Sequence, residues 1–287
     1  MISVIIPAYN EGAVIGRLLE AITAGTRGNE LDIVVVCNGC TDDTARIARQ
    51  FGDQVRVLET SVASKPYALN LGDHAAKAFP RLYVDADVII TINTIRALAC
   101  RLQKGDVLAA APRAQFDLTN SSSLVRAFFK IQSQLPSVLE GIGGSGVYGL
   151  SEIGRRRFEE FPAITADDGY VRIQFTPAER VTLDSLHSVV FAPRNIKSLI
   201  SIKSRSHFGS YELAKCYPAL WQNRGASNHD ALLRLFLNPR LWPALFVYCF
   251  VALEAKRQAK ARMRKNGQTW QRDHSSRHAP ARYTADS

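Results

Sequence analysis

The chain has 287 residues, of which 46% are hydrophobic and 22% charged, so it is long enough for a full core and is not a disordered protein. Its formal net charge is +10, but the stretch from Lys256 to Arg282 holds nine Lys and Arg residues and a single acid, so the rest of the chain is nearly neutral. A duplex-binding domain more often spreads basic residues over its folded face, and we therefore expect no nucleic acid partner.

Over the first 110 residues, short apolar segments alternate with helical patterns. Strands are expected at 2–6, 31–36, 55–58, 82–84 and 106–111. Helices are expected over 14–22, from Thr41 or Asp42 onward, over 66–78 and over 92–103. Because the strand segments are apolar throughout and do not alternate, they predict an α/β fold in which helices cover both faces of a parallel sheet.

Polar residues follow these strands, at the sheet edge where α/β proteins bind ligands. They are Pro7 to Glu11, Asn38 to Asp43, Ser64 and Lys65, and the pair Asp85 and Asp87. If the strand before Asp85 continued, the two carboxylates would point to the same face and would need a neutralising cation. The set suits a nucleoside diphosphate, with Lys65 near phosphate and Asp87 on a hard divalent cation.

The second half of the chain continues with mixed patterns. Segment 121–140 is helical and apolar on one side, and GIGGSGVYGL (141–150) is a glycine-rich turn that leads into a short strand. Asp167 and Asp168 lie at the start of a helix within 164–175, and short strands are expected within 180–193. From about residue 195 the pattern becomes helical and basic, with Lys197, Lys203 and Arg205.

A final helix is expected over 244–265, after Pro239 and Pro243. Its apolar run, followed by basic residues, is compatible with a core helix that has a solvated end. It is also compatible with a helix in a membrane interface, its basic residues against anionic lipid. We favour peripheral membrane contact, which would place lipid-linked saccharides among the acceptors. The last 20 or so residues are polar and are expected to be disordered.

The expected location is the cytoplasm, or the cytoplasmic face of the membrane. The start, MISVIIPAYNEG, lacks the basic region and cleavage site of a secretory signal. No apolar run approaches the roughly 20 residues that cross a bilayer. The five cysteines are scattered, which suggests reduced thiols.

Two short motifs invite other interpretations, which we reject. Cys37-x-x-Cys40 has no second cysteine or histidine pair to complete a zinc site. Gly144-x-Gly146-x-x-Gly149 follows a helical segment, whereas a dinucleotide-binding fingerprint follows a strand and opens a long helix.

Six ordered elements together resemble family 2 glycosyltransferases. They are VIIPAYNEGAVIGRLL, NGCTDDT, SKPYALNLG, YVDADV, GGSGVYG and ADDGYV, which span residues 1 to about 185. The resemblance implies a GT-A fold, an α/β fold with a Rossmann-like mixed sheet, here with a C-terminal helical extension. The expected organisation is a catalytic domain (1–193), a basic helical segment that closes the site (194–240) and an amphipathic, basic tail (241–287).

The resemblance also implies an activity and a role for each matching residue. The activity is inverting transfer of a sugar from a nucleoside diphosphate sugar, helped by Mg²⁺ or Mn²⁺. Asp87 matches the metal-ligating carboxylate and Asp85 the one nearer the ribose, while Asp168 matches the catalytic base, with Asp167 beside it. Nucleotide-binding positions are matched by Pro7, Tyr9, Glu11, Asn38, Asp42 and Lys65.

Two departures from the family pattern concern the contact to the nucleotide base and the number of sugars transferred. The usual Asp-Asp-Gly-Ser loop is Cys37-Asn38-Gly39-Cys40 here, so the contact to the base is altered. The Gln-x-x-Arg-Trp motif of polymerising synthases is absent, which favours single additions to a glycan, lipid-linked or small-molecule acceptor. Asp168 would deprotonate the acceptor hydroxyl, and Asp167 would raise the pKa of that base by like-charge repulsion.

Two rival functions remain open on the sequence alone. A nucleotidyltransferase also places carboxylates and a metal at a nucleotide, although the glycine-rich, basic signature after the first strand is missing. A non-catalytic adaptor would bind membrane or nucleic acid through the basic tail.

Overall fold

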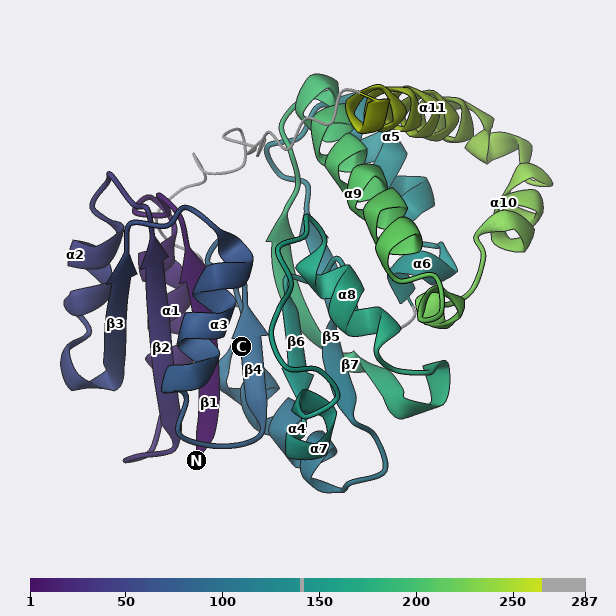
Figure 1. Cartoon of the computed structure of the whole chain (residues 1–287). Helices are drawn as coiled ribbons and strands as arrows, with labels where there is room; N and C mark the ends of the chain where they lie inside the picture. The colour runs from purple at the N-terminus through teal and green to yellow at the C-terminus, as the bar shows by residue number, and fades with distance from the viewer. Residues whose placement is uncertain (140–141, 265–287) are drawn as a thin grey trace.

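The computed structural model describes residues 1–139 and 142–264. Within these residues, seven strands form one sheet in the order β3-β2-β1-β4-β6-β5-β7 (Figure 1). The strands are β1 (Ile2–Ala8), β2 (Leu31–Asn38), β3 (Val55–Thr60), β4 (Arg81–Val84), β5 (Ala109–Asp117), β6 (Val147–Leu150) and β7 (Arg180–Phe191).

Helices cover both faces of this sheet and one end of it. The α-helices are α1 (Ile15–Thr23), α2 (Thr44–Arg49), α3 (Lys65–Ala75), α4 (Ile92–Gln103), α5 (Ser123–Gln132), α6 (Pro136–Leu139), α7 (Glu152–Arg155), α8 (Asp167–Ile173), α9 (Ile196–Cys216), α10 (His229–Phe236) and α11 (Trp242–Arg264). Short 3-10 helices are η1 (Gly52–Gln54), η2 (Pro177–Glu179), η3 (Trp221–Arg224) and η4 (Pro239–Leu241).

The sheet is mixed, as the α/β prediction with a mixed sheet requires. Strand β1 runs parallel to β2 and β4, and β2 runs parallel to β3. Strand β6 is antiparallel to both of its neighbours, β4 and β5, while β5 and β7 are parallel. The parallel half therefore ends its strands at one edge, where the predicted polar residues lie.

The core is built on alternate residues of the central strands. In β1, Val4 and Ile6 pack on one face with α1 and α4, and Ile5 packs on the other with α3. Helix α1 buries its apolar stripe of Ile15, Leu18, Leu19 and Ile22 completely. Each such fully buried Leu or Ile side chain contributes about 1.5–3 kcal/mol of hydrophobic stabilisation.

Two predicted strand boundaries were wrong. Strand β5 begins at Ala109, later than expected, and continues to Asp117 because it pairs with β7 along its length. The two short strands expected within 180–193 form the single strand β7. The pairing register between β5 and β7 shifts between Pro112 and Arg113, where the proline has no N–H for the ladder. This shift explains why the segment that forms β7 looked like two strands in the sequence.

Three predicted helix boundaries also moved. Helix α2 begins at Thr44 and not at Thr41 or Asp42, because the Asp42 carboxylate accepts a hydrogen bond from the Thr44 N–H at 3.0 Å in the preceding turn. Helix α3 ends at Ala75, short of the expected residue 78. Helix α11 begins at Trp242 and holds Pro243 in its first turn, where the missing N–H costs nothing.

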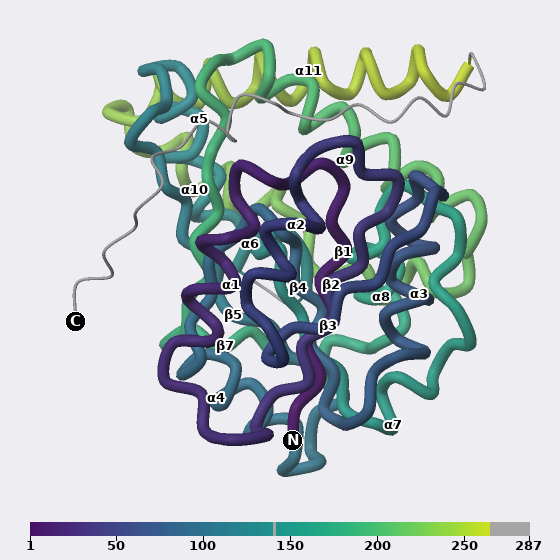
Figure 2. Tube along the Cα trace, turned by 90° about the vertical axis from the view of Figure 1, so that its left-hand side faces the viewer, coloured from purple at the N-terminus to yellow at the C-terminus, as the bar shows by residue number. Residues whose placement is uncertain are grey.

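Helices α9 and α11 pack with α5 into a second, smaller core. Its members include Phe128 and Phe129 of α5, Leu199 of α9 and Val251 of α11. Figure 2 shows α11 crossing the molecule at the end opposite to the N-terminus. One side of the last helix is thus buried, as the core interpretation predicts. The last 20 or so residues, expected to be disordered, lie outside the described residues.

No single helix among the described residues is long and apolar enough to cross a membrane. One bent pair, Trp221–Phe236 with Pro239–Arg264, meets the length and composition criterion jointly, with an angle of 111° between its parts.

Candidate active site

A cavity of about 1030 Å³ lies where the carboxyl edge of the parallel strands meets α8 and α9. All the predicted site residues except Asp42 line it: Pro7, Tyr9, Glu11, Asn38, Lys65, Asp85, Asp87, Asp167 and Asp168. Residues up to 161 positions apart along the sequence thus converge on one cavity.

The two carboxylates of the Asp-Ala-Asp segment lie on a turn, not on a strand. Strand β4 ends at Val84, and the Asp85 N–H donates to the Gly146 carbonyl at 2.8 Å. Gly146 has a φ of 66°, and a Cβ there would lie 2.4 Å from Cγ1 of Val88. The glycine-rich segment before β6 is therefore needed for close backbone approach to this turn. The backbone carbonyl of Asp87 accepts from Arg17 at 3.0 Å.

The Lys65 ammonium neutralises two of the acidic residues, Asp85 and Asp167. Its Nζ lies 2.7 Å from Asp85 and 3.0 Å from Asp167, and the lysine side chain is 22% exposed. Burial alone would lower the pKa of Lys65, but the carboxylates of Asp167 and Asp85 hold it above the usual value. We expected this ammonium to meet phosphate; the structure places it between two carboxylates from different elements.

Asp167 and Asp168 are the first two residues of α8 and have different surroundings. Asp167 is buried, and burial raises the pKa of its carboxyl to about 6, against the lowering effect of Lys65. Asp168 is half-buried, and its carboxylate accepts from the N–H groups of Gly169 at 2.7 Å and Gly144 at 3.4 Å. Like-charge repulsion from Asp168 adds to the burial that raises the pKa of Asp167.

The first two loops are tied to each other. Asn10, at a φ of 52°, accepts a hydrogen bond from the Thr41 N–H at 2.7 Å. Cys40 accepts from the Asn10 N–H at 3.3 Å and donates to the Ala8 carbonyl at 3.2 Å. Cys40 thus takes part in shaping the loop.

Asp42 was predicted at a nucleotide-binding position, but it lies outside the cavity. Its carboxylate accepts from the Gly12 N–H at 3.0 Å and from Thr44, and it does not line the cavity. Asn38, at the end of β2, is the member of this loop that does, and only 3% of it is exposed. In this structure Asp42 fixes the loop geometry and Asn38 faces the site.

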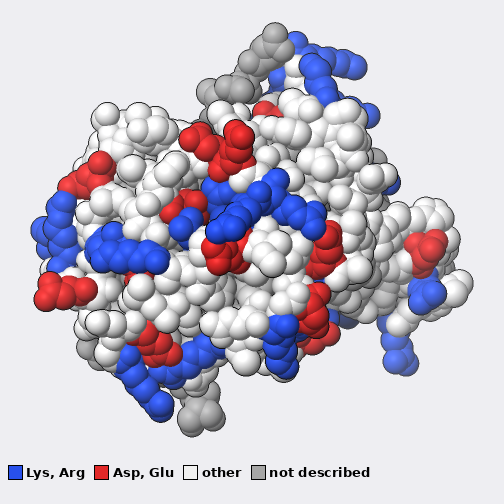
Figure 3. Space-filling model, turned by 60° about the horizontal axis from the view of Figure 1, so that its bottom comes forward, with Lys and Arg blue, Asp and Glu red and all other residues white. Residues whose placement is uncertain are grey.

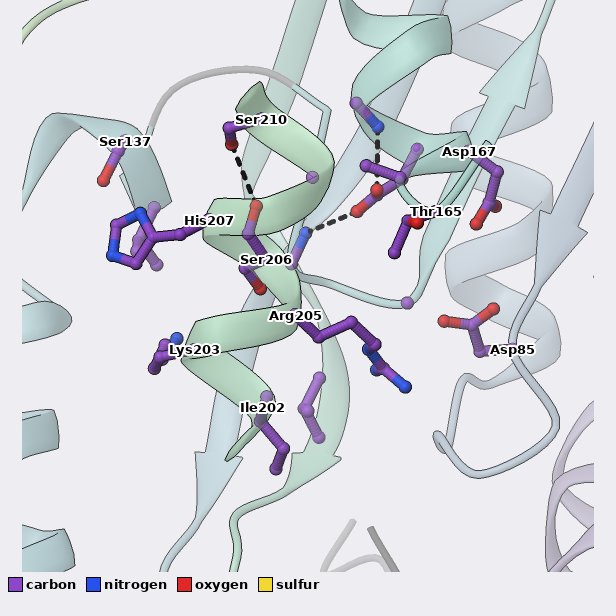
Figure 4. Close-up of a pocket in the computed structure, with 18 of the residues that line it drawn as sticks. Asp85, Ser137, Thr165, Asp167, Ile202, Lys203, Arg205, Ser206, His207 and Ser210 are labelled. Atoms are coloured by element: carbon purple, nitrogen blue, oxygen red, sulfur yellow. Dashed lines mark hydrogen bonds between the residues drawn. The ribbon is translucent and has the colours of Figure 1, made fainter. Parts of the chain in front are cut away.

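Helix α9 supplies residues that the sequence indicated only as a basic segment. Arg205, Lys203 and His207 all line the cavity. Figure 4 shows Arg205 extending toward Asp85, whereas Lys203 and His207 lie on the opposite side of the helix, near Ser137. Helical spacing could have separated these two sides, but nothing in the sequence shows which one faces the acidic residues.

The cavity residues fit a divalent cation that is coordinated partly by the protein and partly by a bound substrate. The described residues contain no group of three or more His, Cys, Asp or Glu side chains that could hold a metal by themselves. Mg²⁺ is usually bound through one or two carboxylates plus substrate phosphates and water. Asp87, half-buried at the cavity, is suited to that arrangement, while Asp85 is paired with Lys65.

The first 160 residues match a family model. It is described as glycosyltransferase-like family 2 and matches residues 1–160. Glycosyltransferase GlyG of Streptococcus pneumoniae is 33% identical over 110 residues, 37% of this chain and 36% of that protein. Glycosyltransferase AglE of Haloferax volcanii is 35% identical over 91 residues, 30% of each protein. The matches span about a third of the length of these curated relatives.

Solved structures with low sequence identity have the same fold. Mannosyltransferase PcManGT of Pyrobaculum calidifontis, in complex with GDP-Man and Mn²⁺, has a TM-score of 0.67 at 16% identity and covers 93% of this chain and 88% of its own. TarS 1–349 of S. aureus, in complex with UDP-GlcNAc, has a TM-score of 0.55 at 14% identity and covers 92% of each chain. These likenesses confirm the predicted GT-A fold.

Proposed function

This chain belongs to glycosyltransferase family 2, and we propose that it transfers one sugar from a nucleotide-sugar donor, with inversion, to an acceptor hydroxyl. The observation that carries the proposal is the convergence of Asp87 and Asp168, from separate elements, on one cavity. The family match gives no support to a nucleotidyltransferase or a non-catalytic adaptor. The missing Gln-x-x-Arg-Trp motif favours a single addition.

The donor lies against the carboxyl edge of the sheet. Tyr9, Glu11 and Asn38 bind the nucleoside, and Asp85 faces the ribose, with Lys65 fixing its carboxylate at 2.7 Å. Asp87 would hold Mg²⁺ or Mn²⁺, which when bound neutralises charge on the diphosphate. Arg205 extends into the same side of the cavity and adds a second positive charge toward the leaving group (Figure 4).

Asp168 is the general base in this mechanism. Its carboxylate reaches the cavity and is oriented by the Gly169 and Gly144 N–H groups. It takes the proton from the acceptor hydroxyl while the oxygen attacks the anomeric carbon opposite to the departing diphosphate. A positioned base typically contributes ~10²–10⁴-fold to the rate. Asp167, buried and paired with Lys65, is a positioning residue that holds the start of α8 against α3.

The outer face of α11 would contact an anionic membrane surface. Trp242, Phe246, Phe250 and Leu253 recur on one side of the helix and are between 51% and 75% exposed. Basic residues follow toward the end of the helix, which is the charge that anionic headgroups attract: Lys256, Arg257, Lys260, Arg262 and Arg264. Because Tyr248 of α11 lines the cavity, this contact would bring the site near a lipid-linked acceptor.

Nucleic acid is not proposed as a partner. Figure 3 shows the lower face of the molecule, where groups of Lys and Arg lie beside groups of Asp and Glu. Duplex binding needs a surface dominated by one sign of charge.

The first test is thermal stabilisation of the full chain by UDP, GDP, dTDP, ADP and CDP, each with and without Mn²⁺. We expect one nucleotide to raise the melting temperature only with the metal, and Asp87→Ala to lose that shift. Asp230→Ala, which changes an exposed aspartate outside the cavity, is the matched control. A metal-dependent shift that survives in Asp87→Ala would disprove the assigned metal residue.

Membrane contact is tested by sedimentation with vesicles. Binding is expected with phosphatidylglycerol vesicles and not with phosphatidylcholine vesicles, and Phe246→Ser with Phe250→Ser should abolish it. A concentration-dependent dimer that the same pair of changes dissolves, without vesicle binding, would instead make this face an interface between two copies.

A further inference from the structure

The turn that carries Asp87 is held on both sides by main-chain hydrogen bonds. Before it, the Asp85 N–H donates to the Gly146 carbonyl at 2.8 Å. After it, Ile89 exchanges two hydrogen bonds with Val189 of β7, at 3.0 and 2.8 Å. These bonds fix the chain before and after Asp87, but none of them is made by Asp87 itself.

Arg17 of α1 reaches the middle of this turn. Its Nη2 donates to the Asp87 carbonyl at 3.0 Å, and both residues are half-buried. The carbonyl of a turn residue has no partner in a strand ladder, so a side-chain donor is needed to hold it. Because the Asp87 carboxylate extends from the same residue, a bond that restrains the Asp87 backbone also restrains the direction of the carboxylate.

The same guanidinium lies over the ring of Phe191, the last residue of β7. The Cζ of Arg17 is 3.8 Å from the ring centroid, well within the range of a cation–π contact. Phe191 lines the cavity, and the chain continues from it into α9. Arg17 therefore joins α1, the Asp87 turn and the end of β7. A planar guanidinium can donate at its edge while its face stacks on a ring, which a lysine ammonium cannot do.

We propose that Arg17 is a positioning residue of the donor site, which sets the direction of the Asp87 carboxylate toward the divalent cation. The inference rests on the proposed function, because it takes Asp87 as the metal ligand. Arg17 is not among the residues that line the cavity, so it acts through the turn and not on the substrate. Groups that orient a metal ligand typically contribute about 10–100-fold to metal affinity.

The first measurement is Mn²⁺ binding to the full chain, followed by the loss of the free-ion electron paramagnetic resonance signal. UDP, GDP, dTDP, ADP and CDP are added in turn. We expect Arg17→Met to weaken Mn²⁺ binding about 10–100-fold. Arg17→Lys keeps a donor for the Asp87 carbonyl and should recover part of that loss. Equal Mn²⁺ affinity of Arg17→Met and the unchanged protein would overturn the proposal.

Arg96→Met is the matched control. Arg96 also donates to a main-chain carbonyl, that of Gly25 at 2.9 Å, and it pairs with Glu30 outside the cavity. Both substitutions should lower the melting temperature, but only Arg17→Met should change the affinity for Mn²⁺. If the two variants lost Mn²⁺ affinity in proportion to their losses in melting temperature, Arg17 would be a stabilising residue only and the proposal would fail.

Amide hydrogen exchange of residues 85–88, without metal or nucleotide, separates this inference from the proposed function. Arg17→Met should speed exchange in this turn and leave the rest of the sheet unchanged. Unchanged exchange, with Mn²⁺ binding that Asp87→Ala abolishes, would refute the positioning role alone. Faster exchange, with Mn²⁺ binding that persists in Asp87→Ala, would refute the proposed metal residue and leave Arg17 with a structural contact.

Discussion

At the scale of single residues, the two neighbouring aspartates of α8 have distinct environments and should have distinct roles. Both line the cavity, but Asp168 is half-buried whereas Asp167 is buried against Lys65. We expect Asp168→Asn to lower kcat about 10²–10⁴-fold, because it removes the base and keeps the shape. Nucleotide stabilisation should be unchanged. If Asp168→Asn kept kcat while Asp167→Asn abolished it, the base would be Asp167.

Lys65 should control the pH dependence of stability at this site. Burial raises the pKa of Asp167 from 3.8 to about 6, so the folded state favours its protonated form. Its contribution is therefore present below about pH 4 and is lost as the pH rises through 6. Lys65 lowers that pKa, so Lys65→Met should raise it further and leave carboxylates facing each other without a cation.

The expected result for Lys65→Met is a loss of up to about 3 kcal/mol in the free energy of unfolding at pH 8, and a smaller loss at pH 5. Urea unfolding at both pH values measures it. Lys77→Met removes an exposed lysine elsewhere and should show no such pH dependence. An equal loss at pH 5 and pH 8 would contradict the ion-pair explanation.

The sequence predicted which residues meet at the site better than it predicted their partners. Asp85, Asp87 and Lys65 follow or precede elements of a parallel sheet, so the fold class alone places them at one edge. The ion pair of Lys65 with Asp167 joins residues 102 positions apart, and no local pattern encodes it. Asp42 satisfies backbone N–H groups in its own turn, which the sequence did not reveal.

At the scale of elements, α9 approaches the start of α8 closely at Gly209. A Cβ on Gly209 would lie 2.6 Å from the Ala166 Cβ and 3.2 Å from the Ala166 N, immediately before α8. Gly209→Ala should therefore push α9 away from α8 and cost about 1–3 kcal/mol of stability. Because Arg205 is on α9 and Asp168 on α8, kcat should fall as well.

Gly16 of α1 provides the matched control for this substitution. A Cβ there would meet only Ile47 Cγ2, at 3.6 Å, which is an ordinary contact. Gly16→Ala should stabilise the protein by about 0.4–1 kcal/mol through the unfolded chain. Thermal unfolding and turnover of both variants test the pair. A Gly209→Ala protein as stable and active as Gly16→Ala would show that α9 does not need this approach.

Regular elements were predictable where local periodicity decides them. The stripe of α1 and the extent of α4 follow from apolar spacing and, for α4, from the Thr91 cap, which accepts from the Thr94 N–H at 3.3 Å. Strand β7 was not predictable as one strand, because its continuity depends on pairing with β5 across the irregularity after Pro112. That pairing is a tertiary property.

At the scale of the whole molecule, α11 has two faces with separate consequences. Its inner face packs Leu245, Val251 and Ala255 into the body. Each fully buried Leu or Val is worth about 1.5–3 kcal/mol, and a domain is stable by only about 5–15 kcal/mol. A chain that ends at Asn238 should therefore lose most of its stability and, without Tyr248, part of the wall of the cavity.

Changes to the outer face of α11 should leave stability intact and remove membrane binding. Phe246→Ser with Phe250→Ser alters side chains that are 75% and 51% exposed, so folding and turnover of a soluble acceptor should persist while vesicle binding is lost. Thermal unfolding and vesicle sedimentation of both proteins measure the contrast. If the shortened chain melted like the full one, α11 would be an appendage and not part of the core. Loss of folding in the double variant would mean that the outer face is itself structural, and the membrane proposal would lose its support.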